Sequence, residues 1–143
     1  MPQSQKNTKV YKEQKFIPLS CEVETIGKAV ANAAYEVHKE LGPGLLERVY
    51  EVCFCHVLTQ SGFYVKRQLF VPIKFKNIAF DEGLRLDVLV NDMVICELKA
   101  LDNMNPVWEA QLLSHLKLCG MRLGYLINFN VPLIKYGIKR MIL

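Results

Sequence analysis

The stretch RLDVLVNDMVICELKA, residues 85–100, decides the fold because it combines two apolar, β-branched runs with three charged side chains. Residues 91–93 (Asn-Asp-Met) separate the runs, which predicts two strands joined by a turn. Asp87, Glu97 and Lys99 lie inside these strands, where an ionised group is costly unless a counter-charge, a metal ion or a ligand compensates it. The sequence therefore predicts a polar site within a sheet.

The second of these strands has two different faces. Successive side chains of a strand point to opposite sides, so Glu97 and Lys99 share a face with Ile95. The other face should pack on a helix layer, because all its residues are apolar: Val94, Cys96, Leu98 and Ala100.

The register of the hairpin decides whether Asp87 joins Glu97. Directly opposed residues of an antiparallel pair share a face of the sheet. A two-residue turn would put the two carboxylates on opposite faces. A three-residue connection over residues 91–93, with Val90 opposite Val94, puts Asp87 opposite Glu97 and is a common hairpin length. A functional site therefore requires an odd-length connection or a compensating bulge.

Two helices are predicted before this hairpin. Apolar residues recur at helical spacing over residues 21–41, after a suitable N-cap at Ser20 and before the helix-ending GPG at 42–44. A second helix is expected from Leu45 to Gly62. Because the connection is short, the two helices should form a hairpin.

The remaining elements complete a mixed α/β (α+β) fold. Residues 64–76 alternate as a strand in which Pro72 suits an edge or a bulge, and 77–83 (NIAFDEG) should turn the chain into an antiparallel meander of three strands. A third helix is expected over 103–120, a buried strand over 122–130 and an extended end after it.

Composition divides the chain into a basic N-terminal arm and one domain. Residues 1–20 are rich in Gln, Lys, Asn and Ser and should form a flexible arm, while residues 21–143 form the domain. The net charge of +4 favours a polyanionic partner.

No apolar segment is long enough to cross a bilayer, so we expect a cytoplasmic protein. The five cysteines have no zinc-binding spacing.

The chemistry of the charged residues favours a metal site. Two adjacent carboxylates resist ionisation together, and a divalent cation resolves that conflict. Oxygen ligands from Asp87, Glu97 and the Leu98 carbonyl suit Mg²⁺ or Mn²⁺, and Lys99 could stabilise charge on a phosphate. The alternative is a structural ion pair of Asp87 with Arg85 or Lys99.

This arrangement resembles the PD-(D/E)xK nuclease superfamily, with Asp87 followed by Glu97-Leu98-Lys99 as its motif. More narrowly, HKELGPGLLERVYE at 38–51 resembles the GxxExxY family, with Gly44, Glu47 and Tyr50 at the named positions. Two later blocks, residues 87–100 and 109–130, are similar to that family as well, so the resemblance covers about residues 21–143. It implies a restriction-endonuclease-like core.

The resemblance also implies roles for individual residues. Asp87, Glu97 and Glu47 would bind Mg²⁺ or Mn²⁺, Lys99 would be catalytic, and Gln111 would face the site. Glu47 is equally well explained as a first-turn carboxylate favoured by the helix dipole. Some branches of the superfamily carry a Tyr four residues after the Gln; here that position is His115, whose role stays open.

Two aromatic side chains, Tyr50 and Trp108, each have two possible roles. Tyr50 could contact a phosphate or pack between helices, and Trp108 could stack on a base or anchor its helix.

The resemblance predicts a metal-dependent nuclease acting on nucleic acid, with DNA favoured. The alternatives are a non-catalytic nucleic-acid- or protein-binding module that retains the fold, and a carboxylate-pair glycosidase, to which the lysine and the small fold are unfavourable. A homodimer or a protein partner is also left open.

Overall fold

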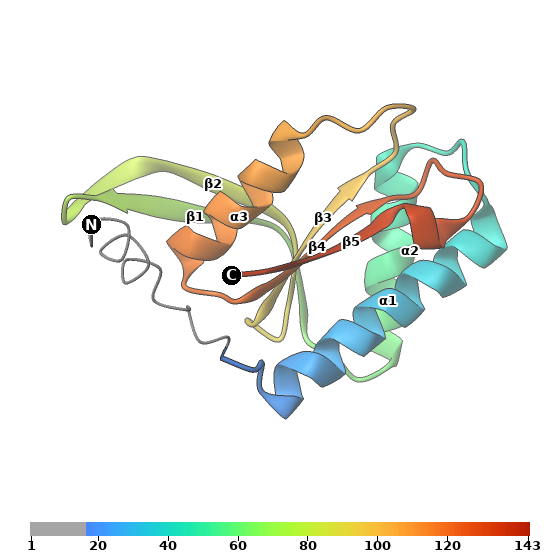
Figure 1. Ribbon diagram of the computed structural model, residues 1–143, viewed down its shortest axis with the longest axis horizontal. Helices are drawn as coiled ribbons and strands as arrows, with labels where there is room; N and C mark the ends of the chain where they lie inside the picture. Colours follow the sequence, from blue (N-terminus) through green and yellow to red (C-terminus); the bar gives the residue numbers. More distant parts are fainter. Residues whose placement is uncertain (1–16) are drawn as a thin grey trace, which may run out of the picture.

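The computed structural model describes residues 17–143, so nearly all of the predicted arm over residues 1–20 lies outside the described residues. Within this range the chain forms α1 (Cys21–Leu41), α2 (Glu47–Gln60), β1 (Val65–Phe75), β2 (Ile78–Val90), β3 (Val94–Lys99), α3 (Val107–Cys119), β4 (Leu123–Asn128), the 3₁₀ turn η2 (Ile134–Tyr136) and β5 (Ile138–Ile142). The predicted mixed α/β fold with a helical hairpin, a meander, a helix and further strands is confirmed (Figure 1).

The strands form one five-stranded sheet in the order β1-β2-β3-β4-β5. β3 and β4 are parallel and are joined through α3, whereas the other neighbours are antiparallel. The helices α1 and α2 cover one face of the sheet and α3 covers the other (Figure 1). As a result, β3 lies in the middle of the sheet with a helix layer on each side.

The two faces of the sheet bury separate apolar clusters. The larger cluster lies under α1 and α2 and includes Val94, Cys96 and Leu98 of β3, as their spacing predicted. The smaller cluster lies under α3 and consists of Leu86, Leu89, Ile95, Leu112, Leu116 and Leu126. The face of β3 that carries Glu97 and Lys99 is therefore the α3 face.

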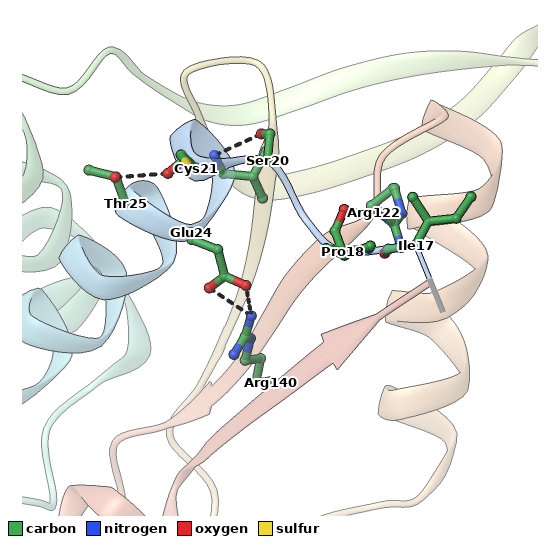
Figure 2. A network of polar contacts seen from close by, with 9 residues as sticks. Ile17, Pro18, Ser20, Cys21, Glu24, Thr25, Arg122 and Arg140 are labelled. Carbon is green, nitrogen blue, oxygen red and sulfur yellow. Dashed lines mark hydrogen bonds and ion pairs between the residues drawn. The ribbon is translucent and has the colours of Figure 1, made fainter. Parts of the chain in front are cut away.

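The start of the described chain lies beside Arg122 and Arg140, on the β4–β5 side of the sheet (Figure 2). Ser20 caps α1 as predicted, because its side chain accepts a hydrogen bond of 3.2 Å from the Val23 amide. The Arg122 guanidinium donates to the carbonyl of Ile17 at 2.6 Å, and Arg140 of β5 pairs with Glu24 of α1 at 2.8 Å. These contacts connect the start of α1 to the edge of the sheet formed by β5.

The predicted turn over residues 77–83 is wrong. The chain turns at Lys76 and Asn77, whose φ values of 51° and 63° fit a two-residue hairpin turn, and Ile78 already begins β2. Gly83 is a strand residue: a Cβ there would lie 2.1 Å from the Val71 carbonyl oxygen, so glycine permits close strand approach. Pro72 does lie on an edge strand beside a register shift, as predicted.

The helix boundaries differ slightly from those predicted. α2 begins at Glu47 rather than Leu45, and α3 begins at Val107, just after Pro106. Gly120 adopts the left-handed conformation, with φ 66°, and ends α3 as expected. None of the helices in residues 17–143 combines the length and the apolar character that a membrane crossing needs.

Candidate functional site

The connection between β2 and β3 has the length that a shared carboxylate site requires. Val90 pairs with Val94 and Val88 with Cys96, so the connection comprises the three residues 91–93. The short polar side chains at Asn91 and Asp92 tolerate the positive φ values, 50° and 54°, that this turn needs. Continued by one residue, the same register puts Asp87 opposite Glu97, as the three-residue connection requires.

Asp87 and Glu97 form a half-buried pair of acids. The Leu98 amide donates to Oδ2 of Asp87 at 2.9 Å, while Glu97 is 8% exposed. Burial and, second, the nearby Glu97 raise the pKa of Asp87 to about 7, and the Leu98 hydrogen bond opposes this rise. The pair can thus hold a proton near neutral pH.

His115 extends this pair into the α3 layer. Its Nδ1 lies 3.2 Å from Oε1 of Glu97, and the ring is 5% exposed. His115, whose role the sequence left open, therefore contacts Glu97 on β3. Gln111, one turn earlier on α3, is exposed to solvent, so the structure brings His115 and not Gln111 against Glu97.

Lys99 lies against an aromatic ring. Its Nζ is 4.9 Å from the centroid of the Trp108 ring at the start of α3, which is within the range of a cation–π contact. In residues 17–143, Asp87 forms no ion pair with Arg85 or Lys99, so the predicted structural alternative is not observed.

Glu47 lies near the pair without joining it. It is the first residue of α2 and is exposed. Partial burial raises the pKa of Glu47, Lys99 lowers it, and Glu51 and Glu97 raise it further, which indicates that the carboxylate is close enough to these groups to interact with them electrostatically. It lines a pocket of about 390 Å³ formed by Glu47, Arg48, Glu51, Arg67 and Gln68.

The same pocket contains a contact that the sequence did not predict. Glu51 is 6% exposed and accepts hydrogen bonds from Arg67 at 2.8 Å and from Gln68 at 2.5 Å. Gln68 has a positive φ of 48°. On either side of it, Arg67 pairs with Val88 and Leu69 pairs with Leu86, so Gln68 of β1 lies opposite Asp87 of β2. The sequence did contain one indication that Glu51 lies in the same pocket as Glu47: the two residues are four apart, which puts them on one face of the helix.

Tyr50 has a structural role. Its hydroxyl donates to the Gly42 carbonyl at 2.6 Å and accepts from the Leu45 amide at 3.0 Å. Its ring is fully buried and stacks on Phe129, with centroids 4.7 Å apart. Tyr50 thereby holds the turn that precedes α2, which fixes the place where Glu47 begins the helix.

The donor set of the site suits a small divalent cation. Nowhere in residues 17–143 do three or more His, Cys, Asp or Glu side chains gather closely enough to hold a metal ion, so Glu47 does not complete a cluster with the acid pair. Mg²⁺ commonly uses only one or two carboxylates and retains several waters. A cation would also relieve the repulsion from Glu97, which after burial is the second cause of the raised pKa of Asp87. Asp87 and Glu97 therefore fit Mg²⁺ or Mn²⁺ as a two-carboxylate site.

Comparison with protein families identifies the fold. The model of the PD-(D/E)XK nuclease superfamily matches residues 24–141, which include the acid pair, Lys99 and the covering helices. No curated protein and no solved structure matched the chain. The narrower resemblance to the GxxExxY family stays a prediction. The mixed sheet with helices on both faces is consistent with a restriction-endonuclease-like fold, and the chain belongs to the PD-(D/E)XK nuclease superfamily.

Proposed function

We propose that the protein is a divalent-metal-dependent nuclease that hydrolyses phosphodiester bonds in nucleic acid. The observation that carries this proposal is the β2–β3 register, which puts Asp87 opposite Glu97. Lys99 follows on the same strand face as Glu97, two residues along. Membership of a nuclease superfamily supports the same reaction class.

Asp87 and Glu97 would hold Mg²⁺ or Mn²⁺ at this site. When bound, the ion supplies positive charge to the phosphate and lowers the pKa of attacking water. Lys99 adds a second positive charge where the phosphate oxygens gain negative charge in the transition state. Its contact with Trp108 keeps the ammonium on the α3 side of the sheet.

His115 is proposed as a positioning residue. With its proton on Nδ1, it donates to Oε1 of Glu97 and orients that carboxylate toward the ion. Glu47 is proposed as an outer carboxylate, because it interacts with Lys99 and Glu97 electrostatically without contacting Asp87 directly. Gln111 is proposed to contact substrate from the exposed surface of α3.

Nucleic acid is the proposed substrate class, with DNA favoured. The net charge of +4 suits association with a polyanion. Arg48, next to Glu47 in the 390 Å³ pocket, puts a cation close to the proposed reaction centre. Arg67 in the same pocket is already paired with Glu51, so we assign it to maintaining the pocket wall.

A cleavage assay with matched variants tests this function. Purified full-length protein is incubated with plasmid DNA and with single-stranded oligonucleotides in Mg²⁺ or Mn²⁺. Asp87→Asn and Lys99→Met should each lower the cleavage rate about a hundredfold or more, because each removes charge needed in the transition state. Circular dichroism checks that each variant is folded.

The controls are an Asp and a Lys outside the site. Asp92→Asn changes an exposed carboxylate of the same hairpin, and Lys117→Met changes an exposed lysine of α3; both should cleave like the parent protein. Cleavage that persists in purified Lys99→Met, or that falls equally in the two controls, would contradict the proposal.

One observation favours the alternative of a non-catalytic binding module. The described residues bring only two carboxylates into direct opposition, without a third ligand in the same cluster. Such a module would bind nucleic acid or a protein partner, including a second copy of the chain, without turnover. Nucleic-acid binding that does not change on adding Mg²⁺ or Mn²⁺, together with no cleavage, would support this alternative.

A further inference from the structure

A hollow lies beside Trp108, the aromatic partner of Lys99, and is not used by the proposed cleavage chemistry. Residues 101–106 and Trp108 line it, and its volume is about 600 Å³. Its wall combines exposed apolar side chains, at Leu101 and Met104, with the amides of Asn103 and Asn105. It therefore offers an apolar surface and polar groups in one place.

The wall of this hollow is held by hydrogen bonds from β4 and the residues after it. The buried Asn128 accepts from the Leu101 amide at 3.1 Å and donates to the Leu101 carbonyl at 2.9 Å. Asn130 donates to Asp102 at 2.7 Å, and the Asn105 side chain accepts from the Val107 amide at 3.0 Å. A wall fixed in this way loses little conformational entropy when a ligand binds.

Trp108 connects the hollow to the proposed reaction centre. The ring packs partly on the apolar cluster under α3, and Lys99 Nζ lies 4.9 Å from its centroid. A phosphate held by Lys99 would therefore lie beside an indole that also lines the hollow. Every nucleobase has a π face that stacks on an aromatic side chain.

We propose that Trp108 and residues 101–106 form a subsite for an unpaired nucleobase next to the phosphate bound at Asp87, Glu97 and Lys99. This inference rests on the proposed function and names its substrate class: nucleic acid that carries an unpaired nucleotide at the cleavage point. A paired base is stacked on both faces within the duplex, so it would have to leave the duplex before it could enter the hollow. The Asn103 and Asn105 amides are suited to the polar edge of the base.

The first test uses the fluorescence of Trp108, the single tryptophan of the chain. Full-length Asp87→Asn protein, which should bind without cleaving, is titrated with a single-stranded oligonucleotide, with its duplex, and with an abasic oligomer of equal length. We expect the single strand to quench the fluorescence and the abasic oligomer to leave it unchanged. The abasic oligomer should also bind about tenfold more weakly, because it lacks the stacking base.

The second test changes the ring and follows binding by the fluorescence anisotropy of labelled oligomers. Trp108→Leu should weaken binding of the single strand about tenfold and leave binding of the abasic oligomer unchanged, whereas Trp108→Phe should retain most of the affinity. Thermal unfolding reports whether each variant folds. If Trp108→Leu does not fold, the comparison of single-stranded and abasic oligomers still decides the matter, because it uses the intact ring.

The outcomes separate the subsite from the cleavage reaction. Equal affinity for single-stranded and abasic oligomers, with unchanged Trp108 fluorescence, overturns the subsite even if the parent protein cleaves nucleic acid. Base-dependent quenching in a protein that never cleaves supports the subsite and contradicts the proposed function. A duplex that binds and quenches as strongly as the single strand also overturns the inference.

Discussion

The two faces of β3 perform different tasks with alternate residues of one six-residue strand. On the face under α1 and α2, Val94, Cys96 and Leu98 are fully buried in the larger apolar cluster. On the face under α3, Ile95 is equally buried, but Glu97 contacts His115 and Lys99 contacts Trp108. The apolar packing on this side thus gives way to polar contacts along the strand.

This difference shows how a small domain holds acids in its core. Packing of the apolar face and of Ile95 fixes the position of β3. The carboxylate of Glu97 is therefore oriented by the packing of neighbouring residues. Substitutions on the apolar face should therefore change stability, and substitutions on the polar face should change binding and catalysis. The predictions below use this contrast.

The largest effect on stability is expected from Leu98→Ala on the apolar face. Leu98 is fully buried, and truncation of such a leucine leaves a cavity that lowers the free energy of unfolding by about 2–5 kcal/mol. Urea unfolding measures this change. Lys99→Met, one residue further on the opposite face, is the control and should change the free energy of unfolding by less than about 1 kcal/mol. Similar losses in both variants would remove the contrast between the faces.

A smaller effect is expected from His115, which supports the polar face from α3. His115→Ala should weaken Mn²⁺ binding about 10- to 100-fold, because the partner that orients Glu97 is lost. His115→Gln can still donate a hydrogen bond and should recover part of the affinity. Isothermal titration calorimetry gives both values. Equal Mn²⁺ affinity in the Ala and Gln variants would show that the contact is only packing.

The smallest effect is the pH dependence that Asp87 gives to stability. Its pKa rises from 3.8 to about 7 on folding, so between these pH values the folded state retains a proton that the unfolded state releases. Stability attributable to this group is therefore complete below pH 4 and is lost as the pH rises through 7. Asp87→Asn should raise the free energy of unfolding by about 1–2 kcal/mol at pH 8, less than the full shift because the carboxyl is partly hydrated.

The control for this prediction is the same comparison at low pH. In buffer with a chelator, the advantage of Asp87→Asn over the parent should shrink steadily between pH 7 and pH 4. An advantage that grows toward low pH would mean that Asp87 is stabilised as a carboxylate in the folded protein.

The parts of the site that depend on local rules were predictable from the sequence. Strand alternation put Glu97 and Lys99 on one face, and the length of the connection at residues 91–93 set Asp87 opposite Glu97. Both rules act within one hairpin, so no tertiary contact could override them. The N-cap at Ser20 was predictable for the same reason.

The parts that depend on packing between distant elements were not predictable. The His115–Glu97 contact requires α3 to lie on the sheet at one rotation, and the Glu51–Arg67–Gln68 contact requires α2 to pack against β1. Gly83 was interpreted as a turn residue, although its lack of a Cβ serves close approach to Val71. Local propensity alone does not distinguish these two uses of glycine.

The central claim is that Asp87 and Glu97 bind one divalent cation together, and Mn²⁺ titration calorimetry at pH 8 tests it most directly. We expect the parent protein and Asp92→Asn to bind Mn²⁺ equally, and Asp87→Asn and Glu97→Gln each to lose at least tenfold in affinity. The double variant should show no detectable Mn²⁺ binding, because it retains neither carboxylate ligand. Unchanged Mn²⁺ affinity in Glu97→Gln, or the absence of binding to the parent protein, would contradict the account.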